Sequence, residues 1–231
     1  MLRISTTAWN VGIPNPVLIR VVQSEPPPIE VLNAVVRRYF ILGIVEIRSC
    51  DWGAHLFDTA QWGNDTERTG PIEVEGKGTH WEGGLFNTVK DYDVTYRYAN
   101  GVVMTCVPGN PGIKFIGTDG WVGNRGWRAD LEASSPDILK SVIGPNEIHL
   151  YTNPEGEHDD FLKCMKSRKD PYFPVDVGHR VSTVCHIANI SIRLGRKLKW
   201  DPKAERFEND AEANQMLSRP MRKPWTLSAA P

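Results

Sequence analysis

Alternation of apolar and polar residues in the middle of the chain predicts a β-sheet. Between residues 92 and 98, tyrosine or valine stands at every second position, the period-two pattern of a strand with one buried face. Asn100-Gly101 follows, which is a strong signal for a hairpin turn. Further apolar runs lie at 102–107, 113–116 and 121–122. We therefore expect an antiparallel meander of at least four strands.

After the predicted sheet the apolar residues recur with helical spacing. Residues 176–194 carry them at three- and four-residue intervals, which predicts a long amphipathic helix. Phe161, Leu162 and Met165 predict one apolar face of an earlier helix, and 210–217 a last short one. Together these elements predict an α+β fold, an open and mostly antiparallel β-sheet with helices packed on one face.

The N-terminal segment, residues 1–48, does not show either pattern clearly. Prolines interrupt it, above all the triplet at 26–28, and such a triplet favours extended backbone. We expect a short helix at 30–38 and a buried strand at 39–47. The chain is therefore divided into a poorly patterned segment and a main domain that covers residues 49–231.

Composition and charge narrow the classes of function. The 231 residues are 40% apolar and 24% charged, with a net charge of −1, which is ordinary for a globular domain. This balance argues against a nucleic-acid or membrane partner. The four cysteines are scattered without a Cys-x-x-Cys pair, so we expect reduced thiols and a cytoplasmic protein. No secretion signal is visible at Met1, although an upstream export signal could be missing.

Several motifs for binding phosphate or metal are missing from the sequence. No Gly-x-Gly-x-x-Gly stands between a strand and a helix, the context in which that motif binds a dinucleotide. The glycine-rich stretch 117–126 occupies a predicted hairpin, and no His-x-x-x-His pair offers zinc ligands on one helix. We therefore expect neither a cofactor-binding loop nor a metal site in this chain.

The candidate chemistry lies in the segment that begins at Asp51. Asp51, His55, Asp58 and Trp62 stand at i, i+4, i+7 and i+11, so a helix starting near Asp51 would carry all four on one stripe. A carboxylate one turn from an imidazole can orient the ring and make it a better general base. From spacing alone, helix capping and surface pairing are the commoner reasons for finding such residues on a helix.

The pattern Asp-x-Gly-x-His-x-x-Asp at 51–58 resembles the active-site motif of the glucose–fructose oxidoreductase/inositol dehydrogenase (Gfo/Idh/MocA) family. Other stretches resemble a bacterial branch of that family in the same order, and the resemblance covers about residues 50–227. These stretches are 69–71, 114–118 with 120–121, 160–164 with 166–168, 178–180, 185–190, 193–198, 200–202 and 218–222.

The resemblance implies the C-terminal domain of an oxidoreductase that uses NAD or NADP on a secondary alcohol of a sugar or cyclitol. It implies that His55 exchanges the proton of the substrate hydroxyl, that Asp51 orients His55, and that Asp58 binds substrate hydroxyls. It also implies a homo-oligomer formed through the face of the sheet.

Two departures from the family pattern refine that expectation. The family's Rossmann half, with its Glu-Lys-Pro motif, has no counterpart here, and residues 1–48 match the family poorly. A truncated gene model, a frameshift or a degenerate paralogue would each explain both departures. We expect no tight binding of the cofactor by this chain alone. An NAD-dependent glycosidase of the same family and a non-catalytic oligomerisation module remain as alternatives.

Overall fold

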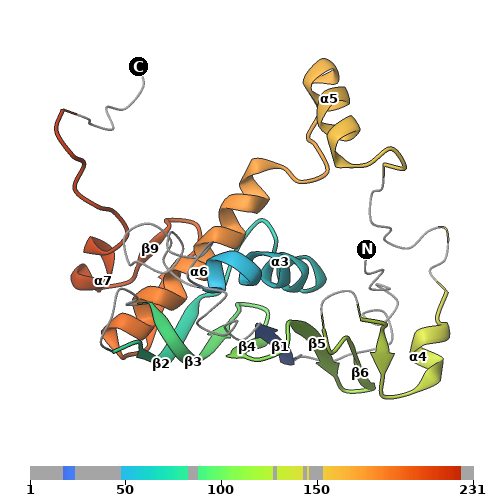
Figure 1. Cartoon of the computed structure of the whole chain (residues 1–231), viewed down its shortest axis with the longest axis horizontal. Helices are drawn as coiled ribbons and strands as arrows, with labels where there is room; N and C mark the ends of the chain where they lie inside the picture. Colours follow the sequence, from blue (N-terminus) through green and yellow to red (C-terminus); the bar gives the residue numbers. More distant parts are fainter. Residues whose placement is uncertain are drawn as a thin grey trace.

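The computed structural model describes residues 18–23, 48–82, 88–126, 129–142, 145 and 153–224. The strands in these residues form one nine-stranded sheet in the order β7-β6-β5-β1-β4-β3-β2-β8-β9. Figure 1 shows the sheet as the lower layer, with helices above it. The strands are β1 (Leu18–Gln23), β2 (Glu73–His80), β3 (Val89–Arg97), β4 (Val103–Pro108), β5 (Gly112–Gly117), β6 (Gly120–Gly123), β7 (Glu132–Ala133), β8 (Leu198–Asp201) and β9 (Arg206–Phe207).

The centre of the sheet differs from the expected meander. The β3–β4 and β5–β6 hairpins form as predicted, both antiparallel. Strands β4 and β5 do not pair with each other, however, because β1 lies between them, parallel to β4 and antiparallel to β5. The prediction of an uninterrupted meander is therefore wrong at this point. Local periodicity does not reveal a strand that joins the sheet from some 80 residues earlier in the sequence.

Two long helices cover one face of the sheet, α3 (Arg48–Gly63) and α6 (Val175–Leu194). Helix α6 lies close to β2 because Gly76 has no side chain there, and a Cβ at Gly76 would lie 2.6 Å from Ile192 Cγ1. The backbone N–H of Gly76 donates a hydrogen bond of 2.8 Å to Ser191 Oγ. The shorter helices are α4 (Pro136–Lys140), α5 (Glu157–Ser167) and α7 (Ala211–Gln215).

The main core lies between the two long helices and the sheet, and Tyr96 is at its centre. The ring of Tyr96 is fully buried and packs edge-on against Phe57 of α3, with 5.6 Å between ring centroids. Its hydroxyl donates to the carbonyl of Val184 in α6 at 3.3 Å. One strand residue thus contacts both helices, and the predicted α+β class with an open, mostly antiparallel sheet is confirmed.

The remaining predictions have mixed outcomes. The helices expected near 161–165 and 210–217 are present as α5 and α7. The helix expected at 30–38 and the strand expected at 39–47 lie outside the described residues. The described part of segment 1–48 includes β1, which the sequence analysis did not assign. None of the described helices is both long and apolar enough to cross a membrane.

The burial of Phe57 makes a direct test of this core. Phe57→Ala is expected to lower the free energy of unfolding by about 3–5 kcal/mol, because it removes the ring that joins α3 to Tyr96 and leaves a cavity. Val142→Ala is the control, since Val142 is 82% exposed, and it should change stability by less than about 0.5 kcal/mol. Urea unfolding of both variants measures the difference, and equal stabilities would contradict the described packing.

Candidate functional site

The two sides of α3 have opposite environments. Its buried side includes Leu56, Phe57, Ala60 and Gln61, which face the core. Of the stripe predicted from spacing, His55 is exposed and Asp58 half-buried on the other side, whereas Trp62 is half-buried and packs against the core. The chemistry-bearing side chains are therefore directed away from the sheet, since positions three and four apart on a helix share a face.

The start of α3 differs from the prediction. The helix begins at Arg48, so Asp51 stands within the first turn and is not the N-cap residue. A carboxylate in the first turn is still favourable to a helix, because it lies near the positive end of the helix dipole. The structure describes only the backbone of Asp51. That backbone lies one turn before His55, and the orientation of the imidazole by Asp51 stays a prediction.

The end of α3 is held by close packing. Gly63 lies against the ring of Phe115 in β5, where a Cβ would come within 2.7 Å of Phe115 Cε1. Only glycine allows the helix to approach the sheet so closely here. The chain then turns at Asp65, whose φ of 55° is in the left-handed region, and this turn brings the following residues back toward the helix.

A polar cluster that includes the buried Gln61, Asn64 and Thr66 joins the same end of α3 to the β3–β4 hairpin. Asn100, in the turn of the hairpin, donates from Nδ2 to Asn64 Oδ1 at 3.0 Å. Thr66 Oγ1 donates to Gln61 Oε1 at 3.1 Å. Buried polar groups need such partners, and these bonds favour one arrangement of the elements, although Nε2 of the buried Gln61 has no hydrogen-bond partner. The sequence analysis identified the hairpin turn but not its role in positioning α3.

The carboxyl of Asp58 has an altered acidity. Burial raises the pKa of Asp58 above its ordinary value, the nearby carboxylate of Glu67 raises it further, and His55 opposes both effects. Glu67 follows α3 and was not identified from the sequence, because only the turn at Asp65 brings it close to Asp58. A carboxyl with a raised pKa beside an imidazole is a frequent feature of functional sites, although structural clusters show it too.

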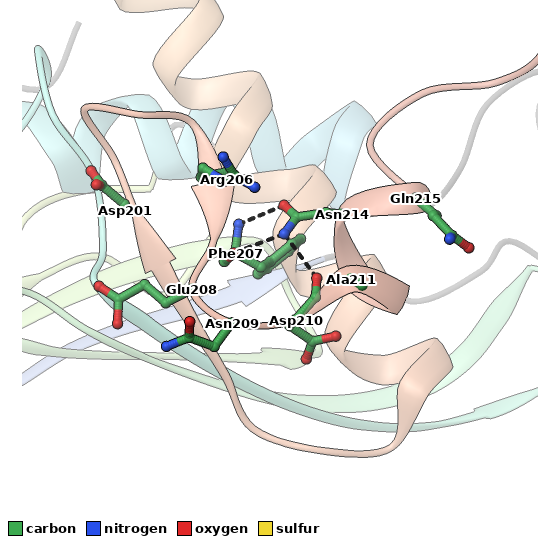
Figure 2. A pocket seen from close by; sticks show the side chains of 9 residues that line it. All are labelled: Asp201, Arg206, Phe207, Glu208, Asn209, Asp210, Ala211, Asn214 and Gln215. Carbon is green, nitrogen blue, oxygen red and sulfur yellow. Dashed lines mark hydrogen bonds between the residues drawn. The ribbon is translucent and has the colours of Figure 1, made fainter.

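A cavity of about 770 Å³ lies elsewhere, between β8, β9 and α7. Figure 2 shows Asn214 beside Phe207, accepting from the backbone N–H of Phe207 and donating to the carbonyls of Phe207 and Asp210. Asp210 also caps α7 and pairs with Arg196, and Asp201 accepts two backbone N–H groups in a turn. These polar groups have structural partners. None of the predicted site residues lines this cavity.

The part of the chain that the structure describes contains no cluster of three or more histidine, cysteine, aspartate or glutamate residues arranged to hold a metal ion. The four glycines between residues 117 and 126 lie in and after the β5–β6 hairpin, as predicted. No described helix begins in this stretch, so no helix N-terminus is present there to bind a phosphate. This glycine-rich stretch is therefore a turn and not a phosphate-binding loop. What the described residues offer is an exposed imidazole near a half-buried carboxyl, a pair suited to proton exchange with a hydroxyl group.

Comparison with known proteins identifies the class of this domain. Residues 47–227 match the model of an oxidoreductase family, specifically its C-terminal alpha/beta domain. The chain belongs to this family, the Gfo/Idh/MocA oxidoreductases, as the motif at 51–58 suggested. No curated protein matches the chain in sequence.

Two oxidoreductases of known structure have a similar fold. The WlbA dehydrogenase of Bordetella pertussis, in complex with NADH and UDP-GlcNAcA, aligns over 85% of this chain with a TM-score of 0.61 and 14% identity. An aldose-aldose oxidoreductase of Caulobacter crescentus, complexed with glycerol, aligns over 84% with a TM-score of 0.58 and 15% identity. In both cases the chain spans 58% of the solved protein.

The raised pKa of Asp58 predicts a gain in stability when its charge is removed. Because the pKa is higher in the folded than in the unfolded chain, stability falls as pH rises through the window between the two values. Asp58→Asn should therefore be more stable than the wild type at pH 7, with the difference closing as pH falls toward the ordinary value of 3.8. Urea unfolding at several pH values measures it.

The matched control for this measurement is Asp130→Asn, because Asp130 is an exposed aspartate remote from α3 in the sequence. It should not reproduce the gain. A wild type more stable than Asp58→Asn at pH 7 would show that the carboxylate has a favourable partner, in conflict with the described environment.

Proposed function

We propose that this chain is the substrate-binding half of an NAD- or NADP-dependent oxidoreductase that acts on a secondary alcohol of a sugar or cyclitol. The observation that carries the proposal is the position of His55 and Asp58 on the exposed side of α3, within a domain of the Gfo/Idh/MocA family. The WlbA dehydrogenase, which has the same fold, was solved with NADH and a nucleotide sugar. The nicotinamide-binding half would have to come from outside this chain.

Each residue has a distinct proposed role. His55 exchanges the proton of the reacting hydroxyl, since its imidazole is exposed and can be reached by a substrate on that side of α3. Asp51, one helical turn before it, orients the ring. Asp58 accepts hydrogen bonds from neighbouring hydroxyls of the substrate. The nicotinamide, when bound, carries the hydride, whereas the protein provides position and proton transfer.

A fusion enzyme tests these roles. The full chain would be joined to the dinucleotide-binding half of the Bordetella pertussis WlbA dehydrogenase and assayed for NADH formation with a panel of sugars and nucleotide sugars. His55→Ala should lower kcat about 10²–10⁴-fold, as expected for loss of a general base. Asp58→Asn should mainly raise KM. His80→Ala is the control, because His80 is exposed at the end of β2.

The outcomes separate the alternatives. Release of an aglycone without net NADH would favour an NAD-dependent glycosidase. Turnover that is equal in the fusion and in its His55→Ala variant would exclude the proposed role of the imidazole. A fusion that binds NADH and yet converts no substrate in the panel would favour a non-catalytic module.

We also propose that the open face of the sheet joins two copies of the chain. In β4, Met104 and Cys106 face the helices and are fully buried, whereas Val103, Thr105 and Val107 alternate with them on the other face and are only half-buried. Around these residues the same face carries charges of both signs, Glu73, Glu75 and Lys77 from β2 and Asp93 and Arg97 from β3. A symmetric contact between identical surfaces would place apolar residues of β4 together and allow these opposite charges to pair around them.

Thr105→Arg tests this contact by placing a long charged side chain in the middle of the open face. The variant should sediment as a monomer at concentrations at which the wild type is a dimer or larger. Ser182→Arg is the control, since Ser182 is exposed on α6, on the helical side of the sheet. A wild type that remains monomeric at high concentration would contradict the proposal.

A further inference from the structure

Helix α5 exposes its apolar residues. Phe161 is 57% exposed, Leu162 56% and Met165 52%. The only buried residue of the helix is Asp160. The sequence predicted the apolar face correctly. However, α5 does not pack extensively against any other described helix or strand. Figure 1 shows α5 standing apart from the other helices, beyond the N-terminal end of α6. An exposed apolar face of this kind marks a contact surface.

The exposure does not come from a poorly formed segment, because α5 and the following loop are held by specific contacts. Asp160 accepts the backbone N–H of Tyr172 at 2.6 Å, which folds the loop back along the helix. Arg168 closes the helix in the left-handed conformation, and its N–H donates to the carbonyl of Cys164 at 2.8 Å. The loop also carries Phe173, which is 57% exposed. The apolar surface is therefore prefolded.

The position of α5 is linked to the proposed active site. Arg68, a few residues after the end of α3, pairs with Asp176 at the start of α6 and lies 3.9 Å from Asp170 in the loop that follows α5. These exposed ion pairs place the loop after α5 beside the segment that carries Glu67, although such pairs contribute little to stability. Figure 1 places α5 on the side of the sheet that bears α3, opposite to the open face.

We propose that Phe161, Leu162, Met165 and Phe173 form the docking surface for the nicotinamide-binding domain. This inference rests on the proposed function, since a domain that presents a nicotinamide to His55 must lie over the exposed side of α3, where α5 stands. The chain spans 58% of the WlbA dehydrogenase, so a large part of that enzyme lies beyond the shared domain. A second copy bound through the open face would lie on the opposite side of the sheet and would leave α5 uncovered.

Hydrogen exchange at the backbone amides of α5 tests the docking without relying on activity. The free chain would be compared with the fusion to the dinucleotide-binding half of the WlbA dehydrogenase, in the presence of NADH. Docking should slow exchange in α5 about tenfold or more, because it removes local opening of an otherwise uncovered helix. The covalent link keeps the local concentration of the partner domain high.

Variants identify the surface responsible. The triple variant Phe161→Ser, Leu162→Gln, Met165→Gln should lose the protection in the fusion while the free variant keeps its helical content by circular dichroism. The control is the pair Leu139→Ser and Val142→Ser, which alters residues that are 46% and 82% exposed in and just after α4. Protection should persist in this control.

Three results would overturn the docking proposal: equal exchange in the free chain and the fusion, protection that survives in the triple variant, or protection in the free chain that rises with its concentration. The last would identify a second copy as the occupant. Protection without turnover would support the docking and contradict the proposed function. Turnover without protection of α5 from exchange would support the proposed function and contradict the docking.

Discussion

The packing of α3 onto the sheet is the constraint on which the rest of the structure depends. The edge-on contact between Phe57 and Tyr96 fixes the rotation of the helix about its own axis. Once Phe57 faces the sheet, helical geometry directs His55 and Asp58 to the opposite side. Gly63 fixes the height of the helix above β5. The core therefore decides where the candidate chemistry lies, although no core residue takes part in it.

The same arrangement explains why Asp58 lies in an unfavourable environment. A half-buried carboxyl close to the carboxylate of Glu67 has a raised pKa, and stability alone would favour a neutral residue there. Functional sites commonly keep such arrangements at the expense of stability. The proposed binding of substrate explains why a carboxylate is kept at this position, because Asp58 would accept hydrogen bonds from the substrate hydroxyls.

Local patterns in the sequence predicted the elements but not all of their neighbours. Alternation at 92–98 and the Asn100-Gly101 turn predicted the β3–β4 hairpin, and helical spacing predicted α6 and the stripe that carries His55 on α3. Strand β1 was missed because its six residues stand among prolines and pair only with distant strands. In retrospect, a short apolar run bounded by turn residues is the signal that could have suggested it.

The site shows the same division between local and non-local information. The stripe of Asp51, His55 and Asp58 follows from spacing within one helix, whereas the approach of Glu67 depends on a turn with a left-handed residue. The apolar residues of α5 were identified from their spacing, but periodicity does not tell whether the partner of such a face belongs to the same domain. Exposure in the folded chain adds that information.

The central claim is that the imidazole of His55 carries a proton for the reacting hydroxyl, and chemical rescue tests it most directly. In the fusion enzyme, the alanine variant at position 55 leaves space that free imidazole can enter. The account predicts that turnover is lost in this variant and returns in proportion to the imidazole added. Full turnover of the variant in the absence of imidazole would contradict the account.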